Sequence, residues 1–286
     1  MPPMPELAIL PAPILIAAAS LLGLLIGSFL NVVIHRVPAM MEREWAAQAA
    51  EIRGEEPVTG APFNLMVPRS RCPACGHEIT ALENIPVISW LFLRGRCSAC
   101  RTPIPIRYPA VELVTAALSG LAISHYGPTA AGLGALILTW FLVSLACIDF
   151  DTQLLPDNMT LPLLWLGLSW NLFGVWTPIS GAVIGAIAGY GILWLVYWGF
   201  KLATGKEGMG YGDFKLLAAL GAWFGWQALP GIILLSSVVG AVVGIGLMVL
   251  ARRGRDVPMP FGPYLAGAGL ISLYFGQPIA AYLGLA

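Results

Sequence analysis

Charged residues are scarce in this chain of 286 residues, in which Asp, Glu, Lys and Arg together make up only 10% of the sequence. A soluble domain typically carries about 25% charged residues, so the composition excludes an ordinary soluble protein. Hydrophobic residues make up 58% of the chain. Apolar runs of about 20 residues recur, and each is long enough to cross the hydrocarbon layer as a helix. We therefore predict an all-α polytopic membrane protein.

Eight apolar segments are predicted to span the membrane. They cover about residues 10–34, 108–125, 129–148, 158–174, 178–200, 213–228, 230–251 and 263–284. The first segment lacks a basic flank and a cleavage site of small residues. These absences argue against a signal peptide and predict a helix that is retained.

Positive charge is missing from one side of the predicted bundle. With the N-terminus outside, short connections near residues 125–128, 174–178 and 226–230 share one side, and none contains Lys or Arg. The basic residues fall on the other side, within residues 36–107 and at Lys201, Lys206, Lys215, Arg252, Arg253 and Arg255. The positive-inside rule makes that side cytoplasmic and places both chain ends outside.

These features predict three parts in the chain. A first transmembrane helix covers residues 10–34, a cytoplasmic domain covers 35–107, and a seven-helix membrane domain covers 108–284. The middle part has low hydrophobicity. With roughly 70 residues it is too small to build a robust core without a cross-link or a metal.

Cysteine is rare, yet four of the five cysteines form two close pairs in the middle part, Cys72 with Cys75 and Cys97 with Cys100. Two C-x-x-C pairs at this separation are typical of a zinc ribbon. Four thiolates with no open position favour a structural Zn²⁺, and a reducing cytoplasm argues against disulfides. A redox dithiol pair and unligated thiols remain the alternatives. His77 lies beside the cysteines, and we expect it at the surface or supporting the site.

Two aspartates, Asp149 and Asp213, lie at the edges of apolar segments. A carboxylate there is costly and is usually kept for function. In the predicted topology both lie at the cytoplasmic face of the membrane, at similar depth. If they pack together, one can activate water while the other protonates a leaving amine, which is the chemistry of an aspartic protease.

A purely structural role explains one of these aspartates better than the other. Asp213 follows a glycine-rich turn, so capping of the helix that begins there is the alternative for it. Asp149 stands at the predicted C-terminal end of a helix, where the helix dipole disfavours an anion. Asp157 follows Pro156 and is expected to cap the next helix.

The residues around Asp213 suit a peptide substrate. Gly210 and Gly212 let another backbone approach closely, and we predict that both bind substrate. Lys215 is either an anchor at the membrane interface or a contact for a substrate carboxylate. Glu112 is the remaining acid inside a predicted span, and both a structural contact, through Arg107 or water, and a functional role stay open for it.

Five segments in order resemble the prepilin peptidases, also called type IV prepilin leader peptidases. They are GSFLNVVIHRVP at 27–38, PRSRCPAC at 68–75 together with CSAC at 97–100, PIRYPAVE at 105–112, IDFDTQLLPD at 148–157 and GYGDFK at 210–215. The resemblance covers about residues 20–265. It implies a bifunctional enzyme that cleaves the basic leader of type IV prepilins and pseudopilins, after a glycine and on the cytoplasmic side. The enzyme then N-methylates the new N-terminal residue with S-adenosylmethionine.

The same resemblance assigns roles to residues of this chain. Asp149 and Asp213 match the catalytic aspartates of the family, and the four cysteines match the members that also transfer a methyl group. The chain lacks the glycine-rich nucleotide fingerprint of a Rossmann fold, so no pattern locates the methyl-donor site. Asn31, Arg36 and Glu112 are candidates for it, because they are polar residues at the cytoplasmic ends of the first two predicted spans.

The expected location is the bacterial inner membrane. Both chain ends would be periplasmic, and the zinc domain and the active site cytoplasmic. The expected partners are prepilins, pseudopilins and the lipid bilayer, with no nucleic acid. Two alternatives remain open: a leader peptidase without methyl transfer, and a non-catalytic membrane scaffold with a zinc-containing docking domain.

Overall fold

A computed structural model describes residues 10–55, 61–250 and 259–282 of the chain. Within these ranges every regular element is a helix and no strand is formed. The predicted all-α class is therefore confirmed. Both chain ends and the basic residues Arg252, Arg253 and Arg255 lie outside the described residues, so the orientation that depends on them stays a prediction.

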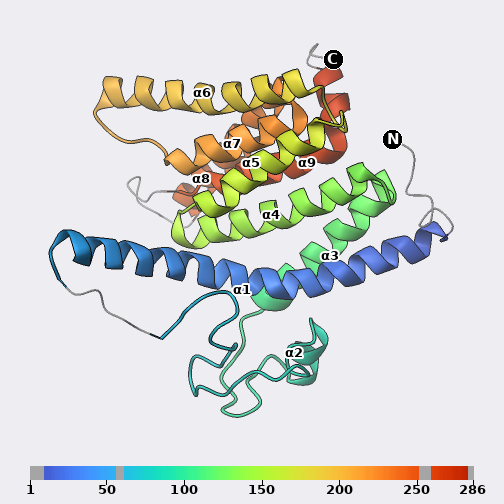
Figure 1. Cartoon of the computed structure of the whole chain (residues 1–286), viewed down its shortest axis with the longest axis vertical. Helices are drawn as coiled ribbons and strands as arrows, with labels where there is room; N and C mark the ends of the chain where they lie inside the picture. Colours follow the sequence, from blue (N-terminus) through green and yellow to red (C-terminus); the bar gives the residue numbers. More distant parts are fainter. Residues whose placement is uncertain (1–9, 56–60, 251–258, 283–286) are drawn as a thin grey trace. The chain divides into compact units, whose positions relative to one another are not determined.

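A helix occupies each of the eight predicted segments (Figure 1). The corresponding helices are α1 (Ala12–Ile52), α3 (Arg107–Tyr126), α4 (Ala130–Thr152), α5 (Asp157–Asn171), α6 (Ile179–Thr204), α7 (Tyr211–Phe224), α8 (Leu229–Leu250) and α9 (Gly262–Tyr282). Two short elements were not predicted, namely α2 (Ile88–Phe92) and a 3₁₀ turn at Trp226–Ala228.

Four helical stretches in the described residues are long and apolar enough to cross a membrane on their own. They are Ala12–Ile52, Ala130–Thr152, Ile179–Thr204 and Trp226–Val249. By contrast, α5 has 15 residues and α7 has 14 residues. At 1.5 Å per residue these helices are only about 22 Å long, shorter than the hydrocarbon layer. The count of eight spans therefore stays a prediction.

The first helix is longer than its apolar run. It was expected to end near residue 34, but α1 continues to Ile52 with Pro38 inside it. Proline removes one hydrogen bond from the helix ladder. Residues 39–52 are rich in Ala, Met, Glu and Gln, which favour helix, so the helix resumes beyond the proline. The predicted boundary at residue 35 thus lies within a continuous helix.

The chain divides into two compact units, one at Ile9–Ser124 and one containing His125–Ala286. In the first unit, α3 packs against the apolar part of α1 through small residues. A Cβ on Gly23 would lie 2.8 Å from the Cα of Ala116, and one on Gly27 would lie 2.7 Å from the Cα of Glu112. Such glycines let two helices approach closely, which is a common device in membranes.

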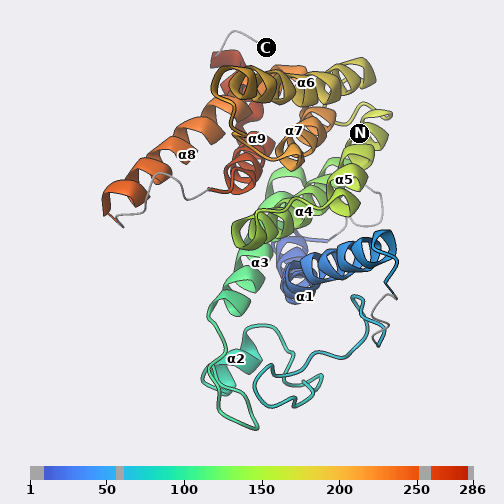
Figure 2. The same cartoon turned by 90° about the vertical axis from the view of Figure 1, so that its left-hand side faces the viewer.

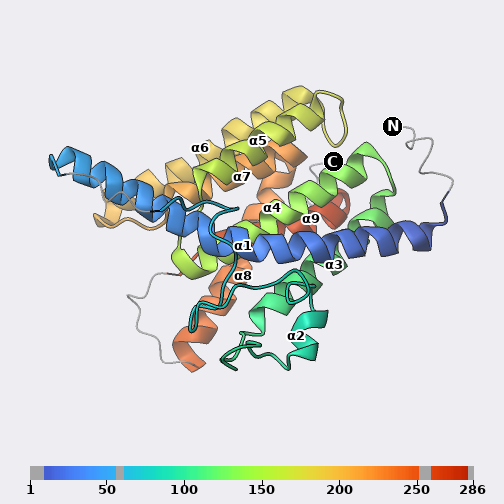
Figure 3. The same cartoon turned by 60° about the horizontal axis from the view of Figure 1, so that its bottom comes forward.

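The second unit is built around α7. Figures 2 and 3 show α7 beside α6, and the residues of α7 from Asp213 to Trp223 are buried with the exception of Lys215. Gly185 of α6 and Gly221 of α7 meet backbone to backbone, since a Cβ on Gly185 would lie 2.3 Å from the Gly221 carbonyl oxygen. At the same end of α7, Asn171 of α5 donates from Nδ2 to the carbonyls of Ala222 and Trp223. These contacts fix the axis of α7 and so the position of its first turn.

Candidate active site and metal centre

Asp149 lies in the last turn of α4, and only 4% of it is exposed. Its Oδ2 accepts a hydrogen bond of 2.8 Å from the backbone N–H of Gly262, the first residue of α9. The first N–H groups of a helix have no partner within the helix, and the dipole there favours an anion. The start of α9 therefore stabilises the carboxylate that the end of α4 would disfavour.

Asp213 lies in the first turn of α7 and is 6% exposed. The residue at the N-cap of this helix is Gly210, so Asp213 lies at the third helical position and not at the N-cap itself. The carboxylate of Asp213 interacts with the Gly210 backbone N–H and, through its charge, with Asp149. The two carboxyl groups therefore lie close enough for their charges to interact, although 64 positions separate them in the sequence. A pair of adjacent buried carboxylates suits a shared proton.

The two glycines before and within this turn have different surroundings. A Cβ on Gly212 would lie 2.6 Å from the Cβ of Leu155, so Gly212 is required for packing inside the protein. A Cβ on Gly210 would meet nothing nearer than 3.9 Å. Of the two, only Gly210 has open space beside it.

Lys215 is engaged by a neighbouring helix. Its Nζ lies 2.6 Å and 2.7 Å from the two carboxylate oxygens of Asp157. Asp157 was expected to cap α5, but Pro156 is the N-cap and Asp157 lies in the first turn of the helix. The prediction of a cap is therefore wrong. The ion pair instead joins the starts of α5 and α7 close to Asp213.

An unpredicted cluster holds the segment that leads into α7. Lys201 Nζ lies 2.8 Å from Glu207 Oε1 and donates to the hydroxyl of Tyr197 at 3.2 Å. The ring of Tyr197 packs against that of Tyr211, with ring centroids 5.2 Å apart. Tyr197 is buried whereas Tyr211 is 47% exposed. The cluster orders the approach to Asp213 and leaves one aromatic face open.

The four predicted cysteines come together. Their Sγ atoms all lie within 4.8 Å of one another, and those of Cys72 and Cys100 are 3.7 Å apart. With Zn–S bonds of about 2.3 Å, the edge of a tetrahedral ZnS₄ site is about 3.8 Å, so the spacing fits such an ion. Hydrogen bonds from the hydroxyl and the backbone of Thr102 lower the pKa of the Cys100 thiol to about 6. These hydrogen bonds favour the thiolate of Cys100, which is the form that binds metal.

The cysteine site is built from two equivalent loops, residues 71–78 and 96–103. In each loop the N–H of the first cysteine donates to the carbonyl of the residue five positions later. The carbonyl of the same cysteine accepts from the N–H of the residue four positions later. The bonded pairs are Cys72 with His77, Gly76 with Cys72, Cys97 with Thr102, and Arg101 with Cys97. The ends of each loop also pair, Arg71 with Glu78 and Arg96 with Pro103. Gly76 and Arg101 occupy the same left-handed position, at φ 74° and 62°.

His77 does not face the sulfurs as a ligand. Its Nε2 lies 3.2 Å from Glu83 Oε1 and 3.2 Å from Ser98 Oγ, so it joins the first loop to the second. Hydrogen bonds from Ser98 and from Thr80 hold the pKa of Glu83 down at about 2. The expected supporting role of His77 fits this contact.

The three candidates for the methyl-donor site are held by internal contacts. Asn31 donates to the carbonyl of Tyr108, and Arg36 donates to those of Asn64 and Pro68 at 2.7 Å and 2.6 Å. These contacts leave the guanidinium of Arg36 committed to one loop. Their part in methyl transfer stays a prediction.

Glu112 is likewise held inside its unit. It accepts the N–H of Val87 at 2.7 Å and interacts with Ser28. Val87 stands at φ 59°, a rare conformation for a β-branched residue. The contact therefore has a clear structural purpose, which is to hold a strained turn beside α3.

Gly262 is the residue of this site that the sequence prediction missed. The Gly262-Pro263 pair directly before the last apolar run is a signal for the start of a helix, because proline suits the first helical positions. The signal places α9 correctly. It does not say which side chain accepts from the first N–H groups of that helix.

Fold and site together define a helical membrane-type protein with a pair of buried aspartates and a separate four-cysteine centre. A sequence model described as Bacterial Peptidase A24 N-terminal domain matches residues 21–126, and one described as Type IV leader peptidase family matches residues 136–245. The chain belongs to the type IV leader peptidase family, which confirms the resemblance seen in its motifs.

Curated relatives carry the name prepilin leader peptidase/N-methyltransferase. The protein of Aeromonas hydrophila is 60% identical over 264 residues, covering 92% of this chain and 91% of the relative. That of Stutzerimonas stutzeri is 57% identical over 274 residues, covering 95% and 94%. One from Burkholderia pseudomallei (strain K96243) is 50% identical over 291 residues, covering 99% and 92%. No solved structure gives a significant match.

Proposed function

We propose that this protein is a bifunctional prepilin peptidase of the bacterial inner membrane. It cleaves the leader of type IV prepilins and pseudopilins and then N-methylates the new N-terminal residue. Family membership and the names of relatives at 50–60% identity support both activities. The observation that carries the peptidase is the pair of interacting, buried carboxylates Asp149 and Asp213.

The arrangement of this pair suits aspartic protease chemistry. The carboxylate that is ionised accepts a proton from water, and the water oxygen attacks the carbonyl carbon of the scissile bond. The protonated partner gives its proton to the leaving nitrogen, after which the C–N bond breaks and a free amine and a carboxylic acid result. The Gly262 N–H fixes the orientation of Asp149 during this exchange. Open space beside Gly210 lies next to the pair and suits an extended substrate backbone.

Methyl transfer needs a donor, and S-adenosylmethionine supplies an electrophilic methyl group for it. Asn31, Arg36 and Glu112 remain our candidates for holding the donor. All three side chains contact backbone groups, since Asn31 also donates from Nδ2 to the carbonyl of Tyr108, but the Oδ1 of Asn31 accepts no hydrogen bond among the described residues. The four cysteines match the methyl-transferring members. Because their Sγ atoms all lie within 4.8 Å of one another, we assign a structural Zn²⁺ to Cys72, Cys75, Cys97 and Cys100.

We further propose eight transmembrane helices with the zinc domain, residues 35–107, and the active site on the cytoplasmic side. In this topology the membrane domain at 108–284 places both aspartates at the cytoplasmic surface. A prepilin is an apolar helix with a cationic leader, so its scissile bond would lie at that same surface. The chain ends would be periplasmic.

The test is cleavage of a synthetic prepilin peptide by the purified protein in detergent, followed by mass spectrometry of the product. We expect Asp149→Asn and Asp213→Asn each to reduce cleavage by roughly 10²–10⁴-fold, the usual contribution of one acid–base group. Asp151→Asn is the matched control, because Asp151 lies on the same helix but is exposed. Cleavage by either catalytic variant at the wild-type rate would contradict the aspartate mechanism. A mature product without the methyl group would leave only the peptidase.

A further inference from the structure

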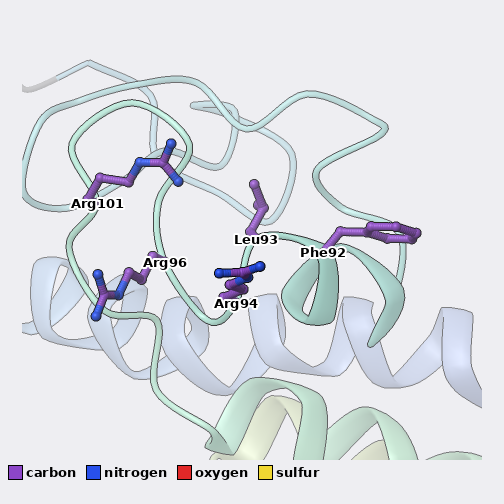
Figure 4. Close-up of a pocket in the computed structure, with 5 residues that line it drawn as sticks. All are labelled: Phe92, Leu93, Arg94, Arg96 and Arg101. Carbon is purple, nitrogen blue, oxygen red and sulfur yellow. The ribbon is translucent and has the colours of Figure 1, made fainter.

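The cysteine-containing unit has a second feature that neither leader cleavage nor metal binding explains. A cavity of about 490 Å³ is lined by Phe92, Leu93, Arg94, Arg96 and Arg101, which we call the arginine pocket (Figure 4). Its three arginines are exposed, and none of them forms an ion pair with another described residue. No acidic residue lines it. The pocket therefore concentrates positive charge and favours an anionic ligand.

Apolar side chains flank these arginines and face solvent. In α2, Leu91 is 61% exposed and Phe92 is 84% exposed, and Ile106 nearby in the sequence is 72% exposed. Figure 4 shows the Phe92 ring projecting outward from α2. Exposed apolar groups beside arginines are typical of segments that lie on a membrane surface, where the rings enter the acyl boundary and the cations remain among the headgroups.

Backbone contacts fasten this surface to the start of α3. Trp90 donates from Nε1 to the carbonyl of Ile104, and the N–H of Ile104 donates to the carbonyl of Gly95 at 2.7 Å. Helix α3 begins at Arg107, three positions after Ile104. Three residues span at most about 11 Å, so the pocket lies close to the first turn of α3.

The start of α3 lies level with the end of the apolar run of α1. Asn31 Nδ2 donates to the carbonyl of Tyr108 at 3.1 Å. Asn31 precedes His35 and Arg36, where the apolar run of α1 gives way to polar residues. The edge of the hydrocarbon layer therefore falls near Asn31 and Tyr108. The headgroup layer extends about 5–8 Å beyond that edge. The arginine pocket therefore lies at the depth of the lipid headgroups.

We propose that the arginine pocket binds the phosphate groups of anionic phospholipids in the cytoplasmic leaflet, with Leu91 and Phe92 entering the bilayer surface. Arginine suits this ligand because its planar fork bonds phosphate oxygens in pairs. The cationic leader of the proposed substrate would be repelled by the same charges, so the pocket is separate from leader binding. The lipid contact would hold the cysteine loops at the membrane. It depends on the proposed membrane location but not on either catalytic activity.

The test is hydrogen–deuterium exchange on the full-length, zinc-loaded protein in nanodiscs. One set contains phosphatidylcholine alone and the other contains about a third phosphatidylglycerol. We expect slower exchange over residues 88–101 in the anionic bilayer. Each arginine near an anionic surface raises the affinity for that surface by about fivefold, so the three together raise it on the order of 100-fold. Arg94→Gln/Arg96→Gln/Arg101→Gln should remove this difference.

The matched control is Arg53→Gln/Arg69→Gln/Arg71→Gln, which makes the same change in charge on other exposed arginines of the unit. This control should keep the dependence on phosphatidylglycerol, and equal loss in both triple variants would overturn the proposal. Equal exchange of the wild type in the two bilayers would also overturn it, without need of any variant. Inorganic phosphate that reproduces the protection in phosphatidylcholine nanodiscs would make this a free-anion site instead. Leader cleavage measured in the same nanodiscs distinguishes failure of this proposal from failure of the proposed function.

Discussion

Replacing Gly262 with alanine would displace one carboxylate of the proposed catalytic pair while leaving the fold in place. A Cβ at this position would lie 2.6 Å from Asp149 Oδ2 and 3.0 Å from its Cγ. Because these atoms end a side chain that can rotate, the backbone need not move. The carboxylate must shift by roughly 1 Å to restore normal contact, and the 2.8 Å hydrogen bond from the Gly262 N–H is then lost or bent.

A misplacement of about 1 Å at a reacting group is enough to reduce a rate by about 10²-fold. We therefore expect Gly262→Ala to cleave a prepilin peptide about 10²-fold more slowly than wild type. The thermal midpoint should fall only slightly. The assay is peptide cleavage by purified protein in detergent, with the melting curve measured on the same sample.

Gly267→Ala is the control, because Gly267 lies on the same helix and a Cβ there would meet nothing within 4 Å. That variant should retain the wild-type rate, since alanine favours helix and fills open space. Wild-type cleavage by Gly262→Ala would refute the inference that Gly262 positions Asp149. A large drop in melting temperature would instead mean that the backbone, and not the carboxylate, gives way.

Three further predictions concern packing, metal and charge. Gly185→Ala should destabilise the protein by about 2 kcal/mol or more, because its Cβ would lie 2.3 Å from the Gly221 carbonyl oxygen. Gly191→Ala on the same helix should not destabilise it, because a Cβ there would enter open space. Thermal unfolding measures both variants. Gly76→Ala should weaken zinc binding by about fivefold and Arg101→Gly should strengthen it by a similar factor, because both positions have φ in the left-handed region. Competition with a chromogenic chelator measures both affinities. Effects of the same sign would disprove the equivalence of the two loops. Neutralising Lys215 or Asp157 should lower the free energy of unfolding by no more than about 1 kcal/mol, because their side chains are 25% and 59% exposed. A double-mutant cycle that shows no coupling would mean that the pair does not join α5 to α7.

The helices of this protein are largely predictable from sequence because apolar runs and helix-breaking residues mark them. The exception is the end of α1, where the change from apolar to polar residues was taken as the end of the helix. Polarity reports the solvent around a helix, whereas its continuation depends on backbone propensity, and residues 39–52 favour helix in water. Pro38 did not stop it, since a proline costs a single hydrogen bond that neighbouring turns can bear.

The candidate site was likewise predictable from the sequence only in part. The four cysteines are predictable because their spacing alone determines that they can meet. The predicted topology puts Asp149 and Asp213 at the same face and at similar depth, but it does not predict that they lie together, because that depends on the lateral order of the helices. The partner of Lys215 and the donor to Asp149 do not follow from it, because Asp157 and Gly262 belong to helices whose lateral order no local pattern records.

The hydrogen bond from Gly262 to Asp149 joins residues that are 113 positions apart. Because α9 follows α4 and α7 in the chain, a growing chain already contains both aspartates well before the donor to Asp149 exists. A ribosome-bound chain that has not yet inserted α9 would therefore hold its acids without the group that orients one of them.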